Sequence, residues 1–177
     1  MEKQEFTKRL EGIKTWLKQE YSGIRTGQAA PALLDNVKVE SYGSMLPLNQ
    51  VGSIGVEDAR TLRIAPWDAG QISAIETAIS EADLGVSVAT DSAGLRVIFP
   101  ELTSERRDQL LKLAKSKLEE ARVSVRGARD EVIKSIEGEE LSEDEKFSMK
   151  EDIQKEVEVM NKALEEIFHA KEKEISQ

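Results

Sequence analysis

One continuous helical pattern, over residues 103–138, constrains the fold of this chain more than any other segment. At 3.6 residues per turn, its apolar residues fall on a single stripe: Leu110, Ala114, Leu118, Ala121, Val125, Ala128, Val132 and Ile136. Beside this apolar stripe, four basic residues fall within roughly 60° of one another on a helical wheel: Lys115, Arg122, Arg126 and Arg129. We therefore predict a long helix with one face for partner helices and, next to it, an arginine row formed by Arg122, Arg126 and Arg129.

Two further segments have the periodicity of partner helices. Residues 2–25 repeat apolar side chains at helical spacing (Phe6, Leu10, Ile13, Leu17 and Ile24), and Gly27 and Pro31 are placed to stop that helix. Ser142 and Glu145 have the spacing of a capping box, which predicts a third helix from about 143 to 175. Its apolar face is expected to contain Ile153, Val157, Met160, Leu164, Ile167 or Phe168, Lys171 and Ile175. Because an amphipathic helix is not stable alone, the pattern predicts a three-helix bundle with its second and third helices antiparallel.

Between the first two helices the periodicity changes to that of strands. Strand candidates are residues 36–42, 51–56, 61–65, 86–89 and 95–99, and a short helix over 71–83 has Ile72, Ile75 and Ile79 on one side. The predicted fold class is α+β, a long three-helix bundle with a small β/α/β domain inserted between helix one and helix two. The bundle is expected to comprise residues 1–28 and 103–177, and the inserted domain residues 31–100. Two short connections, 25–31 and 100–103, predict a hinge at Gly27, Pro31, Pro100 and Thr103.

Composition excludes several classes of function. The 177 residues include no Cys, so the chain has no disulfide, no thiolate nucleophile and no Cys-based metal site. The start of the sequence lacks an apolar signal core, and no stretch approaches 18 apolar residues, so we expect a cytoplasmic protein that does not span a membrane. The net charge of −9 is unevenly distributed: residues 104–134 carry +3, whereas residues 31–103 carry −6 and residues 135–177 carry −8. Because salt screens charges over about 8 Å, the local positive segment matters more for RNA contact than the total.

The arginine row allows two interpretations. Arginine presents a planar fork of donors that suits phosphate and that stacks on exposed bases, which favours nucleic-acid binding. Alternatively the row is a solvated helix flank, neutralised locally by Glu119 and Asp130, and composition alone favours this second interpretation. Arg25, at the end of helix one, and Arg106 and Arg107, at the start of helix two, extend the basic surface near the predicted hinge.

Residues suited to catalysis are few. The only histidine, His169, lies beside Phe168 and is expected to pack in the bundle or to act as a cation near a helix C-terminus. Glu57 and Asp58 are adjacent acids without a partner His or a set of metal ligands. The aromatic residues Trp16 and Trp67 are expected in packing contacts. We predict no enzyme, no cofactor and no metal site.

Several stretches resemble one family when they are taken together. IRTGQAAPALLDNVKVESYG, GVEDARTLRI, AIETAISEADLG, ELTSERRDQLLKLAK and EEARVSVRGARDE occur in an order and spacing similar to those of ribosome recycling factors. The resemblance covers essentially the whole chain. It implies an L-shaped fold similar in outline to tRNA, with a bundle that binds the large ribosomal subunit and a smaller domain that swings about a hinge. It also implies a monomer that splits the post-termination ribosome together with elongation factor G, which hydrolyses the GTP.

The resemblance assigns roles to particular residues of this chain. Arg25, Arg122, Arg126 and Arg129 match arginines that contact large-subunit rRNA in the family, and residues 27–31 and 100–103 match its hinge. Gln28 stands where many members have a basic residue, and Asp130 stands where a second Arg is common. The segment between Arg129 and Ser142 is also shorter than in well-known members, by about one helical turn.

Two other classes of function stay open on the residues alone. The same helices suit a coiled-coil adaptor or chaperone-like module that binds proteins and not RNA. An enzyme with carboxylate chemistry in the inserted domain has the least support.

Overall fold

The computed structural model describes residues 3–177, which form two compact units. The first unit contains the residues up to Tyr21 together with Asp108–Glu174, and the second contains Ser22–Arg107 with Ile175–Gln177. The predicted hinge segments 25–31 and 100–103 both lie within the second unit.

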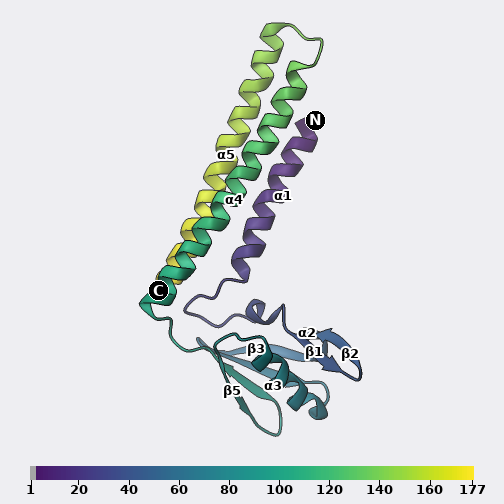
Figure 1. Cartoon of the computed structure of the whole chain (residues 1–177), viewed down its shortest axis with the longest axis vertical. Helices are drawn as coiled ribbons and strands as arrows, with labels where there is room; N and C mark the ends of the chain where they lie inside the picture. The colour runs from purple at the N-terminus through teal and green to yellow at the C-terminus, as the bar shows by residue number, and fades with distance from the viewer. Residues whose placement is uncertain (1–2) are drawn as a thin grey trace. The chain divides into compact units, whose positions relative to one another are not determined.

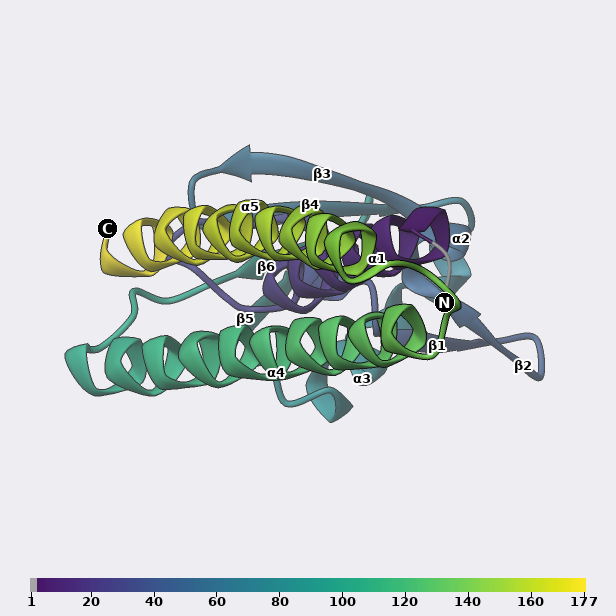
Figure 2. The same ribbon diagram turned by 90° about the horizontal axis from the view of Figure 1, so that it is seen from above.

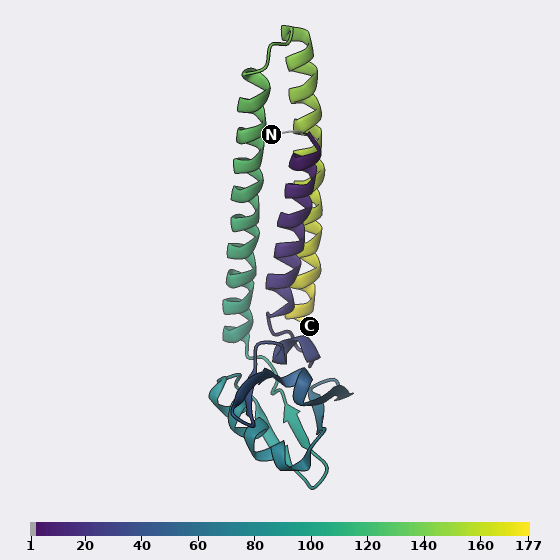
Figure 3. The same ribbon diagram turned by 90° about the vertical axis from the view of Figure 1, so that its right-hand side faces the viewer.

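The first unit is a helical bundle. Helices α1 (Lys3–Ser22), α4 (Ser104–Glu137) and α5 (Glu143–Ser176) lie side by side, and a short turn makes α4 and α5 antiparallel (Figures 1 and 3). All eight residues of the apolar stripe on α4 are buried, as the periodicity predicts. The buried residues of α5 are also the predicted ones: Ile153, Val157, Met160, Leu164, Phe168 and Ile175. The three-helix arrangement is therefore confirmed.

Local side-chain chemistry sets the ends of the helices. Thr103 Oγ1 accepts the Arg106 amide at 3.1 Å, so Thr103 caps α4, with Glu105 in the first turn. Ser142 and Glu145 form the predicted capping box, in which Glu145 Oε2 accepts the Ser142 amide at 2.9 Å and Ser142 Oγ accepts the Glu145 amide at 3.3 Å.

Helix α1 ends earlier than the predicted residue 25. Gly23, which has low helix propensity, directly follows its last residue, Ser22. Tyr21 is buried at the last turn of α1, a position that the apolar periodicity did not identify, and Ile13 is only half-buried. The predicted first residue of this helix, Glu2, lies outside the described residues.

The second unit contains a four-stranded antiparallel sheet in the order β3-β4-β6-β5. Its strands are β3 (Gly52–Asp58), β4 (Thr61–Pro66), β5 (Ser87–Thr90) and β6 (Leu95–Ile98), and Figure 2 shows β3 beside β4. A separate hairpin is formed by β1 (Lys38–Ser41) and β2 (Ser44–Pro47). The helical segments are η1 (Pro31–Leu34), α2 (Leu48–Val51), η2 (Ala69–Gln71) and α3 (Ile72–Glu81).

The core of the second unit lies between the sheet, the hairpin and α3. Its fully buried side chains come from all three and from η1 and α2: Leu34, Val39, Leu48, Leu62, Ile64, Ile75, Ile79, Leu95 and Val97. Val39 and Ser41 are buried while Lys38 and Glu40 are exposed, which is the alternation predicted for this strand. The five predicted strands and the short helix are confirmed, with ends shifted by one or two residues.

Two features of the second unit differ from the sequence prediction. Strand β2 was not predicted, because it is short, ends in Pro47 and is reached through a turn in which Tyr42 has φ +49° and Gly43 φ +83°. The prediction that Trp67 packs is wrong, because its side chain is 70% exposed. The Trp67 amide donates to the Val51 carbonyl just beyond the end of β4, which holds the backbone and leaves the indole outside the core. Over residues 3–177, no helix has both the length and the apolar character needed to cross a membrane.

Candidate nucleic-acid interface

Helix α4 holds the arginine row along the flank that faces α5. Spacings of four and three residues keep the three side chains on one helix face. Arg122 Nη2 donates to Glu165 Oε1 of α5 at 3.2 Å, which locates this flank at the α4–α5 boundary. The opposite flank of α4 faces α1, where Glu131 forms a two-point ion pair with Arg9. The bundle therefore presents the arginine row between α4 and α5, away from α1.

The members of the arginine row differ in exposure and in partners. The side chains of Arg122 and Arg129 are 32% and 31% exposed because they lie next to the apolar stripe, whereas Arg126 is exposed. Arg122 Nη1 donates to Glu119 Oε1 at 2.7 Å, and Arg129 donates from Nε and Nη2 to Asp130 Oδ1 at 3.1 and 2.9 Å. Within residues 3–177, Arg126 has no ion-pair partner. The local ion pairs predicted from Glu119 and Asp130 are thus formed, and Glu165 is a further partner that only the tertiary structure reveals.

Arg25 lies in the second unit, in different surroundings. Its guanidinium lies over the ring of the buried Phe99, 5.5 Å from the centroid. Its Nε and Nη2 atoms are buried without a hydrogen-bond partner in the described chain. Burial, and to a smaller extent the charge of Arg106, lowers the pKa of Arg25. Buried donors without an acceptor are costly, so Arg25 has the capacity to bind an acceptor group at this position.

The predicted hinge segments are tied to the sheet of the second unit at two points. The Ala29 amide donates to the Ala59 carbonyl and the Phe99 amide donates to the Arg60 carbonyl, each at 2.7 Å. Both acceptors belong to the turn between β3 and β4. Pro31 begins η1, beyond the first bond, whereas Gly27, Pro100 and Thr103 lie on the other side of these two bonds.

Residues considered for catalysis do not form a site. The His169 side chain is 63% exposed and lies 3.5 Å from Glu172, so of its two expected roles the packing in the bundle is excluded. Its ring borders Phe168 but points to the outer side of α5, one position beyond the buried face. Glu57 pairs with Arg96 at 2.9 Å. Asp58 Oδ1 accepts the Arg60 amide at 2.9 Å, and this bond lowers the pKa of Asp58. Within residues 3–177, no group of three or more acidic or histidine side chains is arranged to hold a metal ion.

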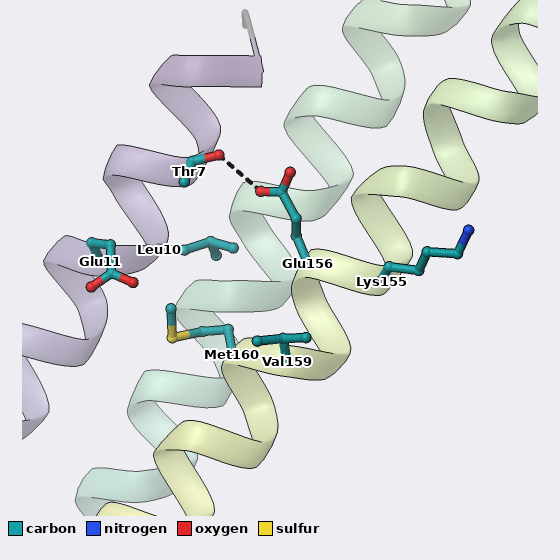
Figure 4. A pocket seen from close by; sticks show the side chains of 7 residues that line it. All are labelled: Thr7, Leu10, Glu11, Lys155, Glu156, Val159 and Met160. Carbon is teal, nitrogen blue, oxygen red and sulfur yellow. Dashed lines mark hydrogen bonds between the residues drawn. The ribbon is translucent and has the colours of Figure 1, made fainter.

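A small groove between α1 and α5 is also unsuited to chemistry (Figure 4). It has a volume of about 280 Å³ and is lined mainly by Leu10, Val159 and Met160. At its edge Thr7 Oγ1 donates to Glu156 at 2.8 Å, so this polar pair is mutually satisfied. The groove lies on the α1 side of α5, and the arginine row lies on the α4 side.

Comparison with known proteins extends over almost the whole chain. The family model described as ribosome recycling factor matches residues 17–175. The ribosome-recycling factor of Endomicrobium trichonymphae is 43% identical over 91% of this chain and 89% of its own length. That of Granulibacter bethesdensis is 39% identical over 99% and 95%, respectively.

Solved structures show the same relationship. A solution structure of a ribosome recycling factor is similar with a TM-score of 0.78 and 38% identity, covering 98% of this chain and 94% of that one. A second similar structure represents the Thermus thermophilus ribosome recycling factor and Escherichia coli elongation factor G bound to the E. coli post-termination complex. It has a TM-score of 0.65 and 35% identity, and covers 97% of this chain and 95% of that one. The chain therefore belongs to the ribosome recycling factor family, a family of translation factors that are not enzymes.

Proposed function

We propose that this protein acts with elongation factor G on the post-termination ribosome and splits it into subunits for reuse. The proposal rests on family membership over nearly the full chain and on the similarity to a recycling factor bound with elongation factor G to the post-termination complex. The chain's own part in this function is to bind and to transmit force, and the GTP is hydrolysed by its partner. The cytoplasm is the compartment that this function requires.

The bundle is proposed to anchor on large-subunit rRNA through the arginine row. The observation that carries this assignment is the position of Arg126, exposed and without an ion-pair partner within residues 3–177, between two half-buried arginines one turn away on either side. Three guanidinium groups on one flank of a straight helix match a run of backbone phosphates. The acidic side chains of α5 that point elsewhere would disfavour other orientations on RNA.

Arg25 is proposed to bind a phosphate oxygen of the same rRNA. Its two buried donors without a partner support the assignment, because a phosphate that reaches them after a local opening of the site would satisfy both. Phe99 fixes the guanidinium from one side and so limits the direction from which the phosphate approaches.

The second unit is proposed to move relative to the bundle, as the domain division and hinge predicted from the sequence require. The two main-chain bonds at Ala29 and Phe99 suggest that Pro31 moves with the sheet. Bending is then confined to residues 22–28 and 100–103, so that Gly27, Pro100 and Thr103 are the positions of the hinge that change conformation. A single fixed distance between labels on the two units, in the free protein and on the ribosome, would exclude this motion.

The anchor is tested by co-sedimentation with large subunits over a salt series. Arg126→Gln is expected to weaken binding and to lower the salt slope by about one, because one phosphate contact is lost. Lys162→Gln is the matched control because it removes the same charge. Lys162 is an exposed cation of α5 without an ion-pair partner in the described chain. Equal affinities of the two variants would show that the arginine row is not the anchor.

The same experiment separates the adaptor alternative. A coiled-coil module that binds proteins would show no steep salt dependence on ribosomal subunits, and neither variant would change it. That outcome would replace the recycling proposal by a protein-binding function.

A further inference from the structure

The arginine row carries its own counter-charges. Three carboxylates from two helices form ion pairs with members of the arginine row. Glu119 and Glu165 pair with Arg122, and Asp130 pairs with Arg129. The six groups together have no net charge. Arg122 and Arg129 are therefore neutralised locally in the folded protein, whereas Arg126 is not.

These ion pairs use donors that a phosphate would need. Arg122 donates from Nη1 to one carboxylate and from Nη2 to another, so both ends of its fork are occupied. Arg129 uses Nε and Nη2, which form the edge best suited to two-point binding of an oxyanion. An RNA phosphate that takes these same donors must displace a carboxylate from Arg122 and from Arg129, whereas Arg126 is open to immediate contact.

We propose that Glu119, Glu165 and Asp130 make the arginine row selective, by weakening its binding to RNA in general more than its binding to one matching rRNA surface. This inference rests on the proposed function. Exposed ion pairs of this kind are weak, so exchanging one carboxylate for one phosphate changes the binding free energy little. An RNA that reaches only one or two of the arginines gains little from the exchange. A surface that engages all three at once, with further contacts elsewhere on the bundle, still binds.

Glu165 provides the sharpest test because its neighbour is a matched control. Glu165→Gln and Glu166→Gln remove the same charge at adjacent positions of α5, but only Glu165 contacts the arginine row, and Glu166 is exposed with no ion-pair partner within residues 3–177. Both full-length variants are titrated with polyuridylic acid and with large ribosomal subunits at several salt concentrations. We expect Glu165→Gln to bind polyuridylic acid about two- to fivefold more tightly than Glu166→Gln, with a smaller gain on large subunits. Equal effects of the two substitutions on both ligands would overturn the proposal.

A double-substitution cycle assigns the effect to the ion pair. The gain in RNA affinity from Glu165→Gln should disappear in an Arg122→Gln background, because the guanidinium that Glu165 pairs with is then absent. A gain of unchanged size in that background would show that the carboxylate acts through long-range repulsion only, and would also overturn the proposal.

The outcomes also distinguish this inference from the proposed function. If Arg126→Gln lowers the affinity for large subunits while Glu165→Gln equals Glu166→Gln, the anchor stands and the selectivity role fails. If Arg126→Gln leaves large-subunit binding unchanged, the anchor itself fails. Circular dichroism of each variant confirms that the helices are retained, as expected for a residue whose side chain is 53% exposed.

Discussion

The hydroxyl of Tyr21 donates a hydrogen bond to the main-chain carbonyl of Ala114, 2.7 Å away, and so joins the last turn of α1 to the middle of the first half of α4. Both residues are buried. The hydrogen bond fixes the axial position of α1 along α4. Apolar contacts between the two helices specify this position less sharply.

Tyr21→Phe is expected to destabilise the protein by about 1 kcal/mol, because one buried hydrogen bond is lost without a change of shape. Tyr42→Phe is the control at neutral pH, since it removes a solvent-exposed hydrogen bond, from the hydroxyl of the 81% exposed Tyr42 to Asp68, whose loss should cost less than about 0.5 kcal/mol. Urea unfolding followed by circular dichroism measures both. An unchanged midpoint for Tyr21→Phe would mean that the bond adds nothing to stability.

Tyr21 is also expected to make the protein less stable at alkaline pH. Burial raises the pKa of Tyr21 to about 12, above its value of about 10 in an unfolded chain. A group whose folded pKa is raised contributes stability that is fully present below pH 10 and is lost as pH rises towards 12. The difference in urea midpoint between the parent protein and Tyr21→Phe should therefore shrink over this range. A constant difference from pH 9 to 12 would contradict the assignment.

Asp91 is expected to make the stability of the second unit depend on pH in the acid range. Its carboxylate accepts both Arg63 Nη atoms, at 2.7 and 2.9 Å, and the amides of Ala93 and Gly94. These hydrogen bonds hold the pKa of Asp91 well below its usual range, and those from Arg63 have the largest effect. Since the folded pKa is depressed, this stabilisation is present above about pH 4 and is lost as pH falls further.

Asp91→Asn should accordingly lower stability at pH 7 and flatten its decline between pH 4 and pH 2. Asp35→Asn is the control, because Asp35 is exposed and its side chain has no ion pair in the described part of the chain. The measurement is the urea midpoint as a function of pH, and identical acid profiles for the two variants would refute the assignment.

Gly94 allows a close main-chain approach between β4 and the turn that leads into β6. A Cβ atom at this position would collide with the carbonyl oxygen of Ile64. Gly94→Ala is therefore expected to destabilise the second unit by about 1–3 kcal/mol. Gly55→Ala in β3 is the matched control, since a Cβ there meets no atom within 4 Å and reduces the entropy of the unfolded chain. Thermal unfolding should rank the control at or above the parent, and Gly94→Ala well below it.

The capping box at the start of α5 should contribute measurably to bundle stability. Ser142→Ala removes the hydroxyl that accepts the Glu145 amide, with an expected cost of about 1 kcal/mol. Ser116→Ala, at an exposed position inside α4, should instead be neutral or slightly stabilising because alanine has the higher helix propensity. Equal urea midpoints for the two variants would argue against the cap.

Periodicity identified those parts of the fold that depend on local pattern. All eight residues of the apolar stripe on α4 are buried where a 3.6-residue repeat places them, because a helix converts sequence spacing directly into a face. The alternation in β1 was readable for the same reason. Strand β2 was not, because its register depends on a turn with two residues at positive φ, and Tyr42 is an unusual residue for that conformation.

The position of the candidate site was predictable from the sequence, but not all of its ion-pair partners were. Helical spacing placed Arg122, Arg126 and Arg129 on one flank, and sequence proximity indicated Glu119 and Asp130 as partners. Glu165 could not be identified in this way, since its contact with Arg122 depends on how α4 and α5 are aligned after folding. The unpaired donors of Arg25 depend likewise on its position over Phe99, which is remote in the sequence.

The order of the helices along the chain has a consequence for synthesis on the ribosome. Helix α1 is made first, but α4 begins about 80 residues later and α5 is made last. At about 5–20 residues per second, the apolar face of α1 waits on the order of ten seconds for its partners, while residues 22–107 have already been made as one continuous segment. The residues of the sheet are therefore complete before those of the bundle, and Phe6, Leu10 and Leu17 have no α4 or α5 to pack against during that interval. The last of these contacts must await the completion of α5, so a stalled or truncated product retains an unpacked apolar segment over residues 3–22.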